Sequence, residues 1–290
     1  MFFGKITNTI SWPKFLYSLW IYTLLVILWG AWVRISHSGD GCGDHWPLCG
    51  GELIPDFTRN KTWIEYSHRL MSGLYGLVIF FVFFNFRKSK SLIVRKLNWF
   101  LLLLMASEAL LGAILVKGQL VSVDDSVFRL LVMSLHQINS FMLTGVTYLF
   151  YLGIKQQKEK INFHYPALLI LFMVLPLTGA IASLSTTLFP SISLWQGILQ
   201  DLSGAPHLFI KLRVLHPLFA VLIAGSFIYW CYLKNLNQLA LEFFLAMVIG
   251  VITLVTLSPV FLKLSHLLIA HLLWARLLYT LVSLPDSSKR

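Results

Sequence analysis

The sequence predicts an all-α membrane protein with eight transmembrane helices. Hydrophobic residues make up 57% of the 290 positions and charged residues only 12%, and the mean hydropathy is +0.76. Apolar runs of about 18 or more residues recur along the whole chain, which is the length that a helix needs to cross a bilayer. Because a backbone in lipid must satisfy its own hydrogen bonds, and no alternating barrel-strand pattern is present, we expect these runs to be helices.

The expected spans and the charges between them predict the topology. The spans are 14–35, 64–86, 97–117, 129–154, 164–188, 207–232, 238–260 and 262–283. Basic connections, such as 87–96 and 155–160, alternate with connections that carry few cations, such as 118–128 and 189–206. Cytoplasmic loops are enriched in Lys and Arg, so this alternation predicts an even number of spans with both termini in the cytoplasm.

The net charge of +11 does not indicate a nucleic-acid partner. The basic residues lie in short loops between apolar runs, which is the positive-inside pattern of a protein surrounded by membrane lipid. Lys5 and Lys14 precede no small-residue cleavage site, so we expect Trp12 to Ser36 to be a retained first helix. Without a presequence, the expected location is the bacterial cytoplasmic (inner) membrane.

A weak internal repeat divides the chain into residues 1–160 and 161–290. Each half has a helix, a longer outer loop, and then a helix with a histidine near its outer end. Four-helix units suit cofactor sites that are built from side chains on facing helices. We therefore expect two pseudo-symmetric four-helix bundles.

Four histidines lie within even-numbered spans, at about the same depth below the outer surface. They are His68, His136, His216 and His266. Ionisable residues within spans are rare and mark candidate functional sites, although isolated histidines can also hydrogen-bond between helices. A haem needs only one or two axial ligands and an apolar slot, whereas zinc and copper usually recruit further ligands. Two histidine pairs therefore predict two haem sites, one in each half.

The residues beside these histidines differ between the halves. Glu65 precedes His68 by three residues and so lies on the same helix face, where it is a candidate acid or base. The alternative is that Glu65 pairs with Arg69. Arg213 precedes His216 by three residues, and both arginines are possible partners of haem propionates. The first half is thus expected to hold the chemical site and the second a bound cofactor.

Cys42 and Cys49 share the outer loop at 36–63 and can pair on the oxidising side of the membrane. Six residues separate them, unlike the C-x-x-C of redox enzymes. A disulfide that braces the loop is the preferred interpretation. Thiol redox chemistry during turnover and free structural cysteines are the alternatives.

An ordered set of short motifs resembles the heme A synthase family. The motifs are Trp32–Ser36, Gly41–Cys49, Glu65–Leu70, His136–Phe141, Thr178–Ala180, Thr187–Pro190, Leu212–Pro217 and His266–Trp274. They span nearly the whole chain. The resemblance implies an oxidoreductase that converts heme O to heme A for terminal oxidases by oxidising a porphyrin methyl group to a formyl group, with water as the oxygen source.

The resemblance also implies a role for each site residue. His68 and His136 would flank the substrate haem, and Glu65 would be the catalytic carboxylate. His216 and His266 would ligate the iron of a permanent heme b. Cys42 and Cys49 resemble the outer-loop cysteine pair of the family.

Several alternatives and partners remain open. His271 follows His266 by five residues, about 140° around the helix, so both cannot face one iron. A two-haem b-type electron-transfer cytochrome and a haem transporter or chaperone are the alternative functions. Heme O synthase and a second copy of the chain are candidate partners.

Overall fold

A computed structural model describes residues 11–56, 58–157, 161, 165–204 and 207–284, and its secondary structure there is helical apart from one isolated bridge between Cys49 and Glu52. The helices are α2 (Trp12–Ile35), α3 (Asn60–Phe86), α4 (Leu92–Lys117), α5 (Val127–Lys155), α6 (Pro166–Leu188), α7 (Leu194–Leu202), α8 (Leu208–Arg213), α9 (Leu215–Leu233), α10 (Asn237–Val255) and α11 (Val260–Ser283). The all-α prediction is confirmed for these residues.

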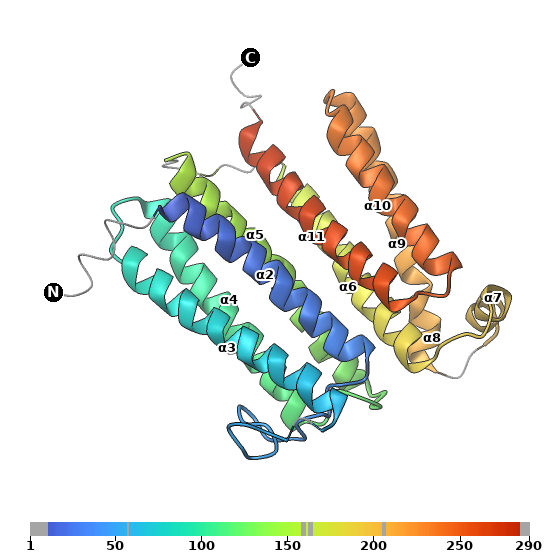
Figure 1. The fold of residues 1–290 in the computed structure, drawn as a ribbon. Helices are drawn as coiled ribbons and strands as arrows, with labels where there is room; N and C mark the ends of the chain where they lie inside the picture. The colour runs from blue at the N-terminus through green and yellow to red at the C-terminus, as the bar shows by residue number, and fades with distance from the viewer. Residues whose placement is uncertain (1–10, 57, 158–160, 162–164, 205–206, 285–290) are drawn as a thin grey trace.

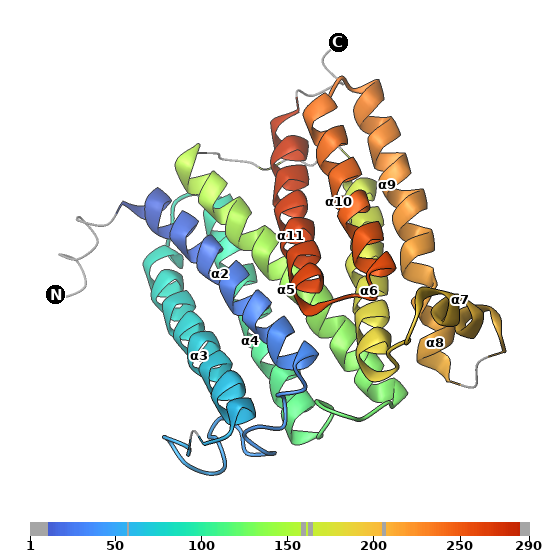
Figure 2. The same cartoon turned by 45° about the vertical axis from the view of Figure 1, so that its right-hand side comes forward.

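The long helices form two adjacent groups (Figures 1 and 2). In the first group, α2 and α4 each contact α3 and α5; in the second, α6 and α10 each contact α9 and α11. Helices α2 and α5 of the first group pack against α6 and α11 of the second. The start of α2 and the end of α11 lie at the same end of the molecule, opposite the loop between α2 and α3 (Figure 1). The side of the membrane that each end faces stays a prediction.

Seven helical segments within the described residues are long and apolar enough to cross a membrane, with α8 and α9 counted together as the segment Leu208–Leu233. Helix α5 is not among them, because His136, Gln137 and Asn139 interrupt its apolar sequence. It is nevertheless 29 residues long and buries 15 of them against α2, α4, α6 and α11. Its polar side chains can therefore be satisfied by protein rather than exposed to lipid. Helix α5 corresponds to the fourth expected span, 129–154, so this span and the total of eight stay a prediction.

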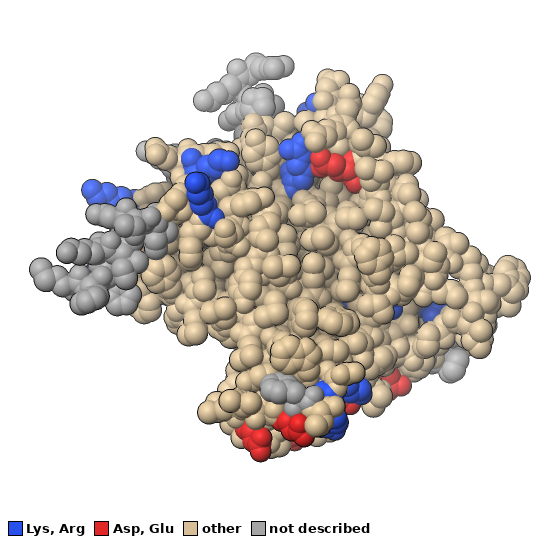
Figure 3. Space-filling model, in the orientation of Figure 1, with Lys and Arg blue, Asp and Glu red and all other residues tan. Residues whose placement is uncertain are grey.

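The distribution of charge agrees with a multi-pass membrane protein. In Figure 3, charged side chains gather toward the two ends of the molecule, and a broad band without Lys, Arg, Asp or Glu lies between them. Large apolar side chains such as Leu77, Phe80 and Phe84 of α3 are exposed. Such a surface is suited to contact with lipid tails rather than with water.

The sixth span is broken, contrary to the continuous helix expected over 207–232. Helix α8 ends at Arg213 and α9 begins at Leu215. Pro217 explains the break, because it has no N–H for the carbonyl oxygen of Arg213 and its ring crowds that carbonyl. The interruption at Val214 lies two residues before His216. The seventh span also differs, since α10 ends at Val255 rather than at residue 260.

The connection 189–206, expected to be a loop, contains the additional helix α7. Ser193 caps it by accepting a hydrogen bond from the backbone N–H of Gln196 at 3.2 Å. None of its residues is buried, and the apolar side chains of Trp195 and Leu202 are largely exposed. An amphipathic helix of this kind, beside the end of a bundle, suits the interfacial layer of a membrane.

Candidate functional site

His216 of α9 and His266 of α11 face each other in the second group. Their ring centres lie 6.2 Å apart, and the ring planes are inclined by 72°. A metal–imidazole bond is about 2 Å long and the ring centre lies about 1 Å behind the nitrogen, so two imidazoles on opposite sides of one iron have centres roughly 6 Å apart. The distance between the two ring centres matches this spacing.

The Nδ1 atoms of the two histidines differ in their hydrogen bonding. The Nδ1 of His216 lies 3.1 Å from Oγ1 of Thr178 on α6, which leaves Nε2 free to be a ligand. Such a hydrogen bond fixes the orientation and tautomer of a metal-bound imidazole. The Nδ1 of His266 is buried without a hydrogen-bond partner. Thr178 belongs to a motif that the sequence identified, but its bond to His216 required the packing of α6 against α9.

Each of the four histidines packs against a glycine of the preceding long helix. A Cβ atom built on the glycine would lie 2.8–4.0 Å from the Cε1 atom of the histidine. The pairs are Gly30 with His68, Gly112 with His136, Gly179 with His216 and Gly250 with His266. The glycines thus make room for the rings, and the arrangement is repeated twice in each group of helices.

The first histidine pair lies beside a carboxylate that the sequence analysis missed. His68 of α3 and His136 of α5 are close enough to interact electrostatically. Glu108 of α4 has Oε1 at 3.5 Å from Nδ1 of His136, and it accepts hydrogen bonds from Asn139 Nδ2 and Ser140 Oγ, both at 2.5 Å. Glu108 is an acid within the expected span 97–117, and the rule that selected the histidines could have selected it as well.

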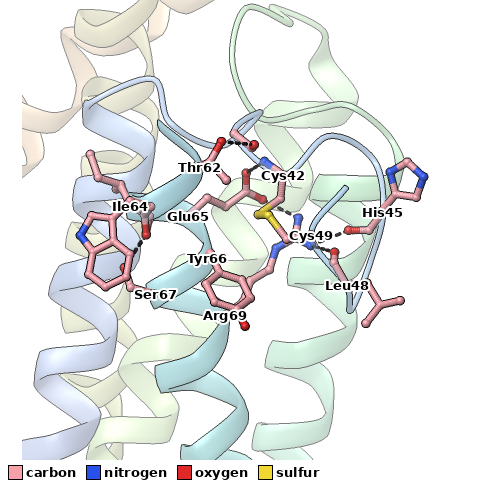
Figure 4. Close-up of a disulfide and its surroundings, with 12 residues drawn as sticks. Cys42, His45, Leu48, Cys49, Thr62, Ile64, Glu65, Tyr66, Ser67 and Arg69 are labelled. Carbon is pink, nitrogen blue, oxygen red and sulfur yellow. Dashed lines mark hydrogen bonds and ion pairs between the residues drawn. A yellow bond between two sulfur atoms is a disulfide. The ribbon is translucent and has the colours of Figure 1, made fainter. Parts of the chain in front are cut away.

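Glu65 is almost fully buried, with 3% of its surface exposed, and is held by two partners (Figure 4). Its Oε1 lies 2.5 Å from Nη2 of Arg69, and its Oε2 accepts a hydrogen bond of 2.8 Å from the backbone N–H of Cys42. The pairing with Arg69 that the sequence left as an alternative is therefore present. Arg69 also donates to the carbonyl oxygens of His45 and Leu48 and so ties the loop between α2 and α3 to α3.

Cys42 and Cys49 form a disulfide, as expected, and both are buried. The bridged loop folds over the N-terminal end of α3, where the N–H of Cys42 reaches Glu65 (Figure 4). The disulfide therefore constrains the segment that holds one oxygen of the buried carboxylate.

We expect replacement of both bridged cysteines by serine to lower the stability of the protein. Loss of the cross-link raises the conformational entropy of the unfolded chain and so lowers the free energy of unfolding by about 2 kcal/mol. Thermal unfolding of the detergent-purified protein measures the effect, with Cys231→Ala, at the buried free cysteine, as a control that leaves the bridge intact. An unchanged melting temperature of the Cys42→Ser, Cys49→Ser variant would argue against a bracing role.

Arg213 is also engaged by protein groups. Its Nε lies 2.6 Å from Oδ1 of Asp201 on α7, and its Nη2 donates to the carbonyl oxygen of Gly197 at 3.2 Å. Arg213 thus fastens α7 to α8. Both arginines that the sequence offered as propionate partners, Arg69 and Arg213, already have carboxylate partners within the chain.

His271 lies apart from the His216–His266 pair. Its Nδ1 lies 3.0 Å from Oγ1 of Thr144, and its ring stacks on Phe141 with centres 3.8 Å apart. Both partners belong to α5, so His271 faces the first group of helices. This position agrees with the expectation that His271 is a polar residue on another face of its helix.

The comparisons with known proteins identify the family. The family described as COX15-CtaA, cytochrome oxidase assembly protein, matches residues 13–59 and 56–278. The chain belongs to this family. A protoheme IX farnesyltransferase of Thermus thermophilus is 31% identical over 287 residues, which are 91% of this chain and 47% of that protein. The chain described here thus spans about half the length of the first curated relatives that it matches.

Shorter stretches match proteins named heme A synthase. That of Alkalihalophilus pseudofirmus is 42% identical over 95 residues, which are 32% of each chain. That of Exiguobacterium sp. is 54% identical over 56 residues, which are 19% of each chain. These similarities agree with the family that the sequence motifs resemble.

Proposed function

We propose that the protein is a heme A synthase, an oxidoreductase that converts a methyl group of heme O to a formyl group with water as the oxygen source. The observation that carries the proposal is the axial spacing of His216 and His266 in a chain of the cytochrome oxidase assembly family. Relatives named heme A synthase supply the reaction class.

The proposal assigns different tasks to the two groups of helices. Residues 1–160 would hold the substrate haem between His68 and His136, and residues 161–290 would hold heme b between His216 and His266. Two carboxylates, Glu65 and Glu108, accompany the first pair. At the corresponding positions of the second half, three residues before His216 and four before Gly250, the chain has Arg213 and Ala246. Carboxylates that could accept a proton or stabilise positive charge therefore lie beside the first histidine pair, and the second half has none at the corresponding positions.

Glu65 would serve as the base that takes a proton from the attacking water, or as the charge that stabilises the electron-poor substrate. Arg69 and the N–H of Cys42 hold its carboxylate in one place, because each donates a hydrogen bond to one of its oxygens. Heme b, when bound, supplies a redox centre that can pass electrons on.

The remaining parts of the proposal concern the surroundings of the chain. We place it in the bacterial cytoplasmic membrane with eight spans and both termini in the cytoplasm. A heme O synthase is the proposed partner, because a protein named protoheme IX farnesyltransferase contains a region similar to nearly the whole of this chain.

The first test is expression of the chain in a host that makes heme O but no heme A. The haems are then extracted from the purified protein and identified by mass. Heme A or its alcohol precursor, together with heme B, supports the proposal. Only unmodified haem, in cells with ample heme O and electron acceptors, would favour an electron-transfer cytochrome or a haem chaperone instead.

The packing of the four glycines against the four histidines leads to a separate prediction. We expect Gly250→Ala to lower the haem content of the second group, because the new methyl carbon would lie 3.0 Å from Cε1 of His266 and displace the ring. Gly73→Ala is the matched control, since a Cβ there meets nothing within 4 Å. The haem-to-protein ratio from absorbance measures both. Equal haem content in the two variants would contradict a positioning role for Gly250.

A further inference from the structure

Two basic side chains near the outer end of the helices lack an acidic partner among the described residues. They are Arg34, in the last turn of α2, and Lys263, in the first turn of α11. Arg34 Nη2 donates to Ser183 Oγ at 2.9 Å, and its Nε is buried with no hydrogen-bond partner. Lys263 Nζ donates to Thr187 Oγ1 at 3.4 Å. Both cations therefore have only neutral hydroxyl partners, which come from α6.

These contacts place both cations above the His216–His266 pair. Gly179, which packs against His216, lies one helical turn before Ser183 on α6, and Thr187 lies one turn further out. Lys263 lies three residues before His266, and so one turn outward on the same face of α11. At a rise of 1.5 Å per residue, one turn is about 5 Å. The two cations are thus about one to two turns outward of the two rings.

The local charge favours an anion at this position. Arg34 and Lys263 carry like charges and contact residues one turn apart on α6, and Arg129 at the start of α5 is a further cation at this end of the helices. Arg129 is itself held by the carbonyl oxygens of Val121 and Asp124. Cations removed from water without a counter-charge are costly, and a carboxylate between them would offset that cost.

We propose that Arg34 and Lys263 bind the carboxylate side chains of the haem that His216 and His266 hold. The inference rests on the proposed function, because it requires a haem at that pair. Haem carries its two propionates on one edge, and an edge that points outward from the rings would reach this site. The guanidinium of Arg34 can bind a carboxylate through two parallel N–H groups, and the ammonium of Lys263 supplies a point charge. Arg213, by contrast, is occupied by Asp201.

The test compares heme b with its dimethyl ester, whose propionates carry no charge. The full chain is purified without haem from a haem-deficient host, in a His68→Ala background that removes one ligand of the first pair. Absorbance titration then gives the dissociation constant of each haem. We expect the unaltered second site to bind heme b about tenfold or more tightly than the ester, since hydrogen bonds to charged groups are strong. In the Arg34→Gln, Lys263→Gln variant this ratio should fall toward one.

Two control variants make the result decisive. Arg87→Gln, Lys88→Gln removes the same charge from exposed positions at the opposite end of the molecule and should leave the ratio unchanged. Arg34→Lys, Lys263→Arg should retain the preference for heme b, which distinguishes lost charge from misfolding. An unaltered ratio in the Arg34→Gln, Lys263→Gln variant overturns the inference.

Two further outcomes identify what has failed. If His266→Ala leaves the affinity for heme b unchanged, the haem is held elsewhere and the ligand assignment of the proposed function falls as well. If inorganic phosphate or vesicles of anionic lipid raise the melting temperature of the haem-free protein through Arg34 and Lys263, while the two haems bind equally, the site belongs to phosphate rather than to propionate. That result also overturns the inference.

Discussion

Glu65→Gln is expected to abolish conversion of heme O to heme A while haem stays bound. Glutamine keeps the size of the side chain and can still contact Arg69 and the N–H of Cys42, but it is neither a base nor a negative charge. Loss of a positioned acid or base typically lowers the rate by about 10²–10⁴-fold. The measurement is the mass of the haems extracted from cells that supply heme O, together with the haem content of the purified protein.

Glu52→Gln is the matched control for this substitution. Glu52 lies in the same outer loop, and its side chain is exposed, so the same chemical change there should leave heme A output intact. A normal yield of heme A from Glu65→Gln would remove the residue from the mechanism and leave it as the partner of Arg69. Loss of haem from that variant would instead indicate a structural role.

Loss of haem from the second group is the expected result of His266→Ala. The substitution removes one of two rings that stand 6.2 Å apart, and the remaining histidine cannot hold the iron from both sides. We expect haem occupancy at this site to fall by at least about tenfold, since loss of a direct ligand should cost no less than loss of a residue that only supports one. Absorbance of the haem relative to protein, in the His68→Ala background, reports the occupancy.

His271→Ala provides the comparison on the same helix. His271 is buried and bonded to Thr144, so its removal should lower stability through a cavity and a lost hydrogen bond. Its ring faces α5 rather than His216, and we therefore expect the haem content to be kept. Haem loss from His271→Ala with retention in His266→Ala would reverse the assignment of the axial ligand.

The helical architecture was predictable from the sequence because the length and polarity of apolar runs are local properties. Helix α3 and helix α4 lie where such runs were expected. The break at Val214 and the helix α7 were missed for opposite reasons. Pro217 carried a local signal for the break, whereas α7 is a short amphipathic segment inside a connection that was judged by its charge.

The sequence by itself predicted that four histidines lie at similar depths, because helical rise converts position in the chain into depth. It also placed Glu65 beside His68 and brought Cys42 within reach of Cys49. Only the tertiary structure decided which groups meet across helices. It set His216 opposite His266, brought Glu108 to His136, and gave Arg69 and Arg213 acidic partners while leaving Arg34 and Lys263 with none among the described residues. The reason is physical: depth follows from the rise along one helix, whereas contacts depend on the rotation and packing of helices far apart in the chain, as for Arg34 and Ser183, which are 149 residues apart.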